Sequence, residues 1–97
     1  MATSVAEIQA AVHGGCERLA AIVASFRNAI QRLENQVEGN EENLDKLRAQ
    51  TNPDQNTINQ IALIEQTLTT LRDQISQQQD NLAAAQSDYE GLCPATT

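Results

Sequence analysis

The stretch Thr51-Asn52-Pro53-Asp54-Gln55 lies at the centre of the chain and separates two long segments of helical character. Pro53 has no backbone N–H and a restricted φ, so it is disfavoured inside a helix but tolerated at the first helical position. Asn52 is a suitable N-cap with Gln55 at capping-box spacing, and Thr51 with Asp54 is a second register of that signal. We therefore predict that the chain reverses direction here; a kink in one long helix is the alternative.

The composition indicates an all-α protein of one domain, residues 1–97. Phe26 and Tyr89 are its only aromatic residues, and glycine and proline are scarce. No run of 18 apolar residues occurs, so we expect no membrane span. Residues 1–4 do not begin a basic and then apolar leader, so we expect a protein that is cytoplasmic or exported without a cleavable signal peptide.

The net charge of −7 is unevenly distributed along the chain. Residues 1–51 hold five basic and seven acidic residues, whereas residues 52–97 hold one basic and six acidic residues. An acidic surface repels phosphate groups, so we expect neither a nucleic-acid partner nor binding to an anionic membrane.

A seven-residue repeat covers the segment 16–50, which we predict to be the first helix. Its a positions are Cys16, Val23, Ile30, Val37 and Leu44, and its d positions are Leu19, Phe26, Leu33, Asn40 and Leu47. Ile22 and Ala29 widen this apolar stripe beyond a strict two-stranded seam. Asn40 has two interpretations: a polar core residue that sets the register, or an exposed residue near the helix end, which we favour.

The same repeat continues after the turn at 51–54, in a second helix predicted over 53–90. Its a positions are Ile61, Leu68, Ile75, Leu82 and Tyr89, and its d positions are Ile64, Leu71, Gln78, Ala85 and Leu92. We interpret Gln77-Gln78-Gln79 as helix surface with one polar core site. Gly91 as a C′ glycine and the following Pro94 should end the helix, leaving 91–97 as a tail.

An N-terminal arm over 4–13 precedes the first helix. Ser4 is its candidate cap, and Val5, Ile8 and Val12 give it an apolar stripe. The pair Gly14-Gly15 should mark a hinge, a kink or a close approach of another backbone. The arm would lie beyond the reach of the second helix and stay available to a neighbour.

Folding the chain at its centre brings Cys16 and Cys93 to the open end of the hairpin. We predict a disulfide between them, which would stabilise the fold by roughly 4 kcal/mol; two reduced thiols are the alternative. A zinc site with His13 would need an acidic fourth ligand, so we expect no metal and no cofactor. One histidine, no phosphate loop and no carboxylate pocket predict no enzyme and no small-molecule substrate.

The apolar stripes are three positions wide, so two helices cannot bury them completely. We predict that the antiparallel, coiled-coil-like two-helix hairpin joins a second copy or a larger protein, forming a four-helix bundle or a larger assembly. The predicted interface residues are Val5, Ile8, Val12, Leu19, Ile22, Val23, Phe26, Ile30, Leu33, Val37, Ile61, Ile64, Leu68, Leu71, Ile75 and Leu82.

In size, helicity and the central polar break at 51–55, the chain resembles the small helical-hairpin proteins associated with type VII secretion. Asn52-Pro53-Asp54 stands where that family has its Trp-X-Gly turn, and Cys93 stands where its C-terminal export signal, which would begin at Tyr89, has an acid. The resemblance implies export without a signal peptide or a chaperone-like pairing role.

The sequence thus favours a non-enzymatic helical module for protein–protein interaction, an adaptor or chaperone-like partner. The first alternative is a structural subunit of a virion, filament or scaffold assembled through the heptad stripes. The second is an elongated parallel coiled coil, in which Cys16 would link two chains.

Overall fold

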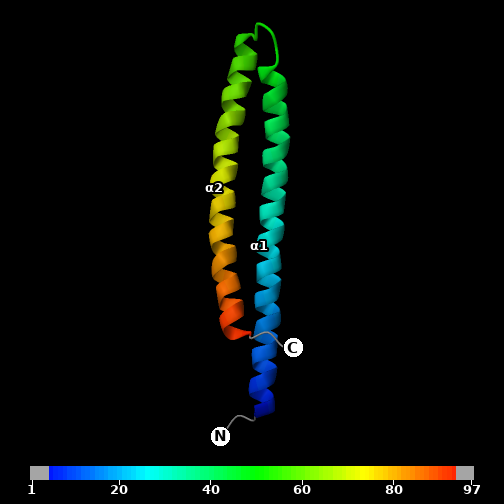
Figure 1. The fold of residues 1–97 in the computed structure, drawn as a ribbon, viewed down its shortest axis with the longest axis vertical. Helices are drawn as coiled ribbons and strands as arrows, with labels where there is room; N and C mark the ends of the chain where they lie inside the picture. Colours follow the sequence, from blue (N-terminus) through cyan, green and yellow to red (C-terminus); the bar gives the residue numbers. More distant parts are fainter. Residues whose placement is uncertain (1–4, 94–97) are drawn as a thin grey trace.

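The computed structural model describes the backbone of residues 5–93 and the side chains of residues 15–93. It contains two helices, α1 (Val5–Arg48) and α2 (Gln55–Leu92), which pack against each other in opposite directions. The molecule is a narrow rod of 78 × 25 × 14 Å (Figure 1). The predicted antiparallel hairpin is confirmed, and both the single kinked helix and the elongated parallel coiled coil are wrong for this chain.

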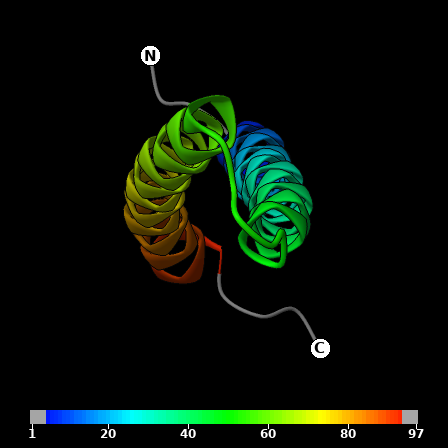
Figure 2. The same cartoon turned by 90° about the horizontal axis from the view of Figure 1, so that it is seen from above.

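Each helix also sweeps sideways along its length, as the view from above shows (Figure 2). Sideways curvature of this kind keeps the a and d residues of both helices at their common seam. The buried apolar residues are Val23, Ile30, Leu44, Leu68, Leu71, Ala85 and Cys93. All but Cys93 occupy predicted a or d positions, so the seven-residue repeat identified the seam correctly.

The turn starts two residues earlier than the sequence predicted. Helix α1 ends at Arg48, and the chain then leaves it through a hydrogen bond from the Gln50 N–H to the Leu47 carbonyl (3.3 Å). Asn52 adopts a left-handed conformation with φ 54°, a region that asparagine tolerates better than most residues. Asn52 therefore helps to reverse the chain.

The cap of α2 differs from both predicted registers. Asp54 is the N-cap, with extended backbone, and its Oδ1 accepts a hydrogen bond from the Thr57 N–H at 2.8 Å. Asn52 does not cap the helix, because a cap residue has extended backbone and Asn52 is left-handed. Thr51 does not cap it either, since the N-cap is Asp54. Pro53 consequently precedes the cap instead of opening the helix. The hydrogen bond from the Thr57 N–H holds the pKa of the Asp54 carboxyl below its usual value.

The predicted end of α2 at Gly91 is also wrong. The helix continues through Gly91 to Leu92, and Cys93 is the C-cap, with its N–H donating to the Tyr89 carbonyl at 2.7 Å. Gly91 does not have the left-handed φ of a C′ glycine. The disulfide of Cys93 to α1 holds this end of the helix in place, so a glycine cap is not needed; Pro94 lies outside the described residues.

Helix α1 is not interrupted at Gly14-Gly15, contrary to prediction, and its backbone runs continuously from Val5. A Cβ placed on Gly15 would meet no atom within 4 Å, so no other backbone approaches there. The helical turns on both sides offset the low helix propensity of two glycines. The predicted arm is therefore the first part of α1, which extends past the end of α2 (Figure 1).

Candidate interaction surface

The hairpin has two long flanks, one on each side of the seam. The first, called here the charged flank, has these residues at its e positions: Ala20, Arg27, Glu34, Glu41 and Arg48 of α1, and Ile58, Glu65, Arg72, Gln79 and Gln86 of α2. The second, the amide flank, has these at its g positions: Ile22, Ala29, Gln36, Asn43 and Gln50 of α1, and Gln60, Thr67, Gln74, Asn81 and Asp88 of α2. Asp88 is the one charged residue in the second set.

Hollows that join the two helices support this division, because each of them lies on a single flank. On the charged flank, Glu41, Arg48, Glu65 and Arg72 surround the apolar pair Leu44 and Leu68. On the amide flank, two hollows each join α1 to α2. They are lined by Ala29, Arg32, Leu33, Gln36, Gln74, Gln77 and Gln78, and by Asn43, Lys46, Leu47, Gln60, Leu63 and Ile64.

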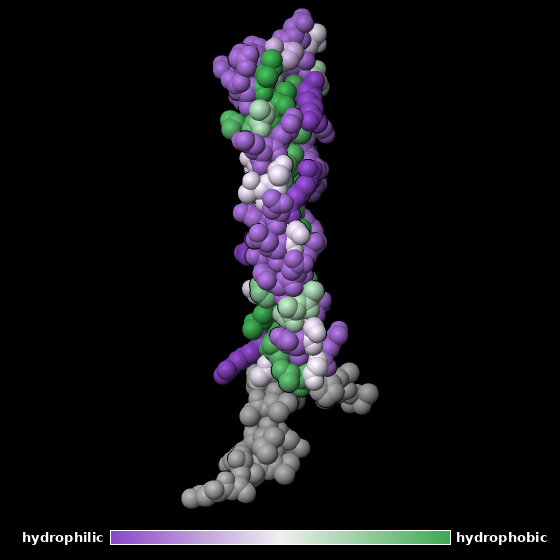
Figure 3. All heavy atoms as spheres, turned by 90° about the vertical axis from the view of Figure 1, so that its left-hand side faces the viewer, coloured by the Kyte–Doolittle hydropathy of each residue, from purple (hydrophilic) through white to green (hydrophobic). Residues whose placement is uncertain are grey.

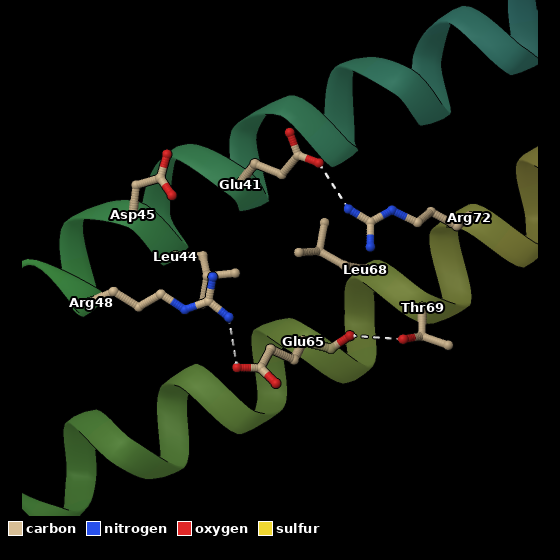
Figure 4. Close-up of a pocket in the computed structure, with 8 residues that line it drawn as sticks. All are labelled: Glu41, Leu44, Asp45, Arg48, Glu65, Leu68, Thr69 and Arg72. Atoms are coloured by element: carbon tan, nitrogen blue, oxygen red, sulfur yellow. Dashed lines mark hydrogen bonds and ion pairs between the residues drawn. The ribbon is translucent and has the colours of Figure 1, made fainter.

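Two ion pairs cross the charged flank between the helices (Figure 4). Arg48 Nη2 lies 3.1 Å from Glu65 Oε1, and Arg72 Nη2 lies 2.9 Å from Glu41 Oε1. All four side chains are half exposed or more, so each pair stabilises the fold by only about 0.2–1 kcal/mol. Their main effect is to neutralise charges on this flank and to favour one antiparallel register.

The amide flank contains a polar group without a partner. The Oε1 atom of Gln78 is buried and accepts no hydrogen bond from any described residue. Gln78 occupies a d position and is half-buried, whereas Gln77 and Gln79 are exposed, which matches the predicted single polar core site. Asn40, at another d position, is half-buried rather than exposed, and its side-chain amide donates to the Gln36 carbonyl of its own helix at 2.7 Å.

The predicted interface residues fall into four groups by burial. Val23, Ile30, Leu68 and Leu71 are buried inside the hairpin, where they hold its helices together. Half-buried residues form the larger group: Leu19, Phe26, Leu33, Val37, Ile61, Ile64, Ile75 and Leu82. Ile22 is exposed. The side chains of Val5, Ile8 and Val12 lie outside those that the structure describes.

Further large apolar side chains are exposed, and the predicted interface did not include them. Leu63 and Leu92 retain 62% and 64% of their accessible surface, and Ile58 retains 47%. Ile58 and Leu63 lie in the first turns of α2, and Leu92 is its last residue. On the face shown in Figure 3, hydrophobic atoms gather towards the two ends of the described part, with mostly hydrophilic atoms between. Leu63 is a c residue beside the amide flank, so it broadens the apolar stripe near the turn.

The predicted disulfide between Cys16 and Cys93 is confirmed. It joins the end of α2 to α1 across a sequence separation of 77 residues, with the two Cα atoms 5.7 Å apart. The bonded sulfurs leave no thiolate for the zinc site considered from sequence, and the described residues contain no cluster of three metal-ligating side chains. The side chain of His13 lies outside the described residues.

Within residues 5–93, neither helix includes a stretch that is long and apolar enough to cross a membrane. What the described surface offers chemically is apolar area, side-chain amides and two ion pairs along a narrow rod. Comparison of the chain with protein-family models, with curated proteins and with solved structures found no match.

Proposed function

We propose that the protein is a non-enzymatic helical interaction module, an adaptor or chaperone-like partner that binds another protein chain through apolar side chains along its seam. The observation that carries this proposal is the incomplete burial of the seam. Between residues 15 and 93, every large side chain keeps at least 2% of its surface accessible to water, and several large apolar side chains are exposed. Binding a further helix or helices would remove this apolar surface from water.

The energetics of the isolated hairpin support the same proposal. Two helices share one seam, and ordering each residue costs roughly 1–2 kcal/mol of backbone entropy, which a single seam offsets poorly. The Cys16–Cys93 disulfide compensates by restricting the unfolded chain, by about 4 kcal/mol. The hairpin therefore has the means to persist alone while it keeps apolar surface for a partner.

The disulfide also supports the exported alternative for where the protein works. Disulfides persist in oxidising compartments and are rare in a reducing cytosol. Together with the resemblance to helical hairpins of type VII secretion, this favours a role in pairing with a larger protein during or after export.

One observation favours the second candidate function, a structural subunit. Helix α1 begins at Val5, eleven residues before Cys16, and this part of α1 has no α2 beside it (Figure 1). In a filament or scaffold, it would lie against the next copy.

Light scattering combined with small-angle X-ray scattering separates the two candidates. A compact particle of one or two chains supports the interaction module, and a concentration-dependent polymer supports the structural subunit.

The interaction itself is tested with a photo-cross-linking residue at Leu63, with the exposed Gln66 on the outer face of α2 as the matched control. Cross-links to a specific chain from Leu63 alone support the proposal. Equal or no cross-linking from both sites, with a monomer in solution, would refute it.

A further inference from the structure

We propose that the amide flank is the interface to a second copy of this chain, and that two hairpins stack there as a four-helix bundle with both turns at the same end. This inference rests on the proposed interaction function and specifies its partner and its face. The half-buried d residues of both helices line this flank, as do the exposed Ile22 and Leu63.

The scarcity of charge at the g positions of this flank fits a second copy better than an unrelated partner. In a two-fold symmetric interface the same surface patch meets itself, so any charged residue near the axis faces an identical charge. Nine of the ten g residues are uncharged, although the chain as a whole carries a net charge of −7. A face that is neutral near the axis can therefore meet its own copy without repulsion.

Amide side chains give this flank self-complementary hydrogen bonding. Each glutamine or asparagine carries two N–H donors and a carbonyl acceptor, so identical faces can bond to each other. Gln78 has a buried Oε1 without a donor, on a flank where Gln74 and Gln36 lie nearby. That acceptor is enclosed within its own hairpin, so the amides that a second copy could reach are those of the exposed Gln36 and Gln74.

The charged flank does not offer an equivalent surface. Two of its three arginines, Arg48 and Arg72, are already paired with glutamates of the opposite helix. Covering them with a second copy would remove four half-exposed charged groups from water. The free-energy cost of that desolvation commonly exceeds the Coulombic stabilisation of the ion pairs. The second copy therefore belongs on the other side of the seam.

The border of the amide flank determines how the two copies are oriented. On α1 the adjoining c positions include Arg18, Arg32 and Lys46, whereas the c positions of α2 carry no charge. Placing α1 against the α1 of the second copy would bring the two basic borders together. Placing α1 against the second copy's α2 avoids this repulsion, and it brings Arg18 to the end of the bundle where the opposite α2 carries Asp88.

Two isoleucines provide a matched test of the face. Ile22 at a g position is 44% exposed, and Ile58 at an e position is 47% exposed, so they differ in flank but hardly in exposure. In analytical ultracentrifugation of the full chain, Ile22→Glu should weaken dimerisation by a factor on the order of 100 or more, because symmetry places the charge in the interface twice. Ile58→Glu should change it by less than about threefold.

Circular dichroism should show that both variants keep their helices. Ile22→Thr is a second, milder substitution on the same flank. Equal weakening by Ile22→Glu and Ile58→Glu, or weakening by Ile58→Glu alone, overturns the assignment of the flank. A wild-type chain that stays monomeric at all concentrations overturns the second copy as partner. That result leaves the proposed interaction function standing, since the cross-linking from Leu63 tests it independently.

The orientation is tested with a spin label at the exposed Thr51, attached through a keto amino acid so that the disulfide stays intact. Labels of the two copies should lie close together at one end of the dimer. Labels separated by roughly 57 Å, the length of 38 helical residues at 1.5 Å each, would mean that the turns are at opposite ends and would overturn the orientation.

Discussion

Cys16 and Cys93 lie 77 residues apart in the sequence and are bonded to each other, with their Cα atoms 5.7 Å apart, at the end of the hairpin opposite the turn. The turn and the disulfide thus join the two helices at both ends of their shared seam. A closed structure of this kind restricts the unfolded chain far more than the turn alone does.

Reduction of this disulfide should destabilise the hairpin by about 2–4 kcal/mol, because the unfolded chain regains the entropy of an open loop. Urea denaturation with and without reductant measures the difference. The double variant Cys16→Ser with Cys93→Ser is the control and should resemble the reduced protein under both conditions. Identical midpoints for the oxidised and reduced wild type would contradict the prediction.

Burial of a and d residues determines how much each contributes to stability. Leu68 is only 3% exposed at the seam, so Leu68→Ala should lower the free energy of unfolding by roughly 2–4 kcal/mol through lost burial and the cavity left behind. Leu63→Ala, on the exposed neighbour of the seam, should change the monomer by less than about 0.5 kcal/mol. Chemical denaturation at low protein concentration gives both values, and similar losses at the two sites would count against the seam described here.

The Asp54 cap should be sensitive to acid. Its pKa is lowered in the folded protein by the hydrogen bond from the Thr57 N–H, so its stabilising effect is fully present above the ordinary aspartate pKa of about 3.9. That effect is lost as the pH falls through the lower, folded-state pKa. An NMR titration of the Thr57 amide should show a midpoint below the ordinary value.

Asp54→Asn is the matched control for this titration, because asparagine also caps helices but does not titrate. The Thr57 amide should then be insensitive to pH in the same range. A midpoint at or above the ordinary aspartate value in the wild type would mean that the hydrogen bond does not hold in solution.

The ion pair between Glu41 and Arg72 should contribute weakly and depend on salt. Both side chains are at least half exposed, so a double-mutant cycle with Glu41→Gln and Arg72→Gln should give a coupling of about 0.2–1 kcal/mol. The coupling should shrink markedly in 1 M salt, where the screening length falls to about 3 Å. A coupling that salt leaves unchanged would indicate that the pair is shielded from solvent.

The sequence predicted features that depend on periodicity and missed those that depend on local backbone conformation. The repeat that includes Val23, Ile30 and Leu68 identified the seam, and folding the chain at its centre brought the two cysteines together. The cap failed because Asn52 and Asp54 are both good cap residues, and the left-handed backbone of Asn52 decided between them.

The sequence-based predictions did not include the observed end of α2 or the difference between the two flanks, for different reasons. Gly91 matches a helix-ending signal, but the disulfide at Cys93 holds the helix beyond it, and a tertiary bond of this kind does not enter a local pattern. The two flanks could have been read from the e and g positions of the heptads. The width of the apolar stripe does not distinguish one flank from the other, whereas the cross-helix ion pairs and the hollows of the folded hairpin do.

Gln78 leads to the last prediction, because its buried Oε1 has no donor among the described residues. Gln78→Leu should stabilise the monomeric hairpin by roughly 1–2 kcal/mol, since it removes an unsatisfied acceptor and adds apolar contact at a d position. Gln79→Leu, on the exposed face next to it, is the matched control and should have almost no effect. The measurement is thermal or urea denaturation at a concentration where the chain is monomeric. A loss of stability in Gln78→Leu there would show that the glutamine finds a hydrogen-bond partner within its own hairpin, and would contradict the prediction.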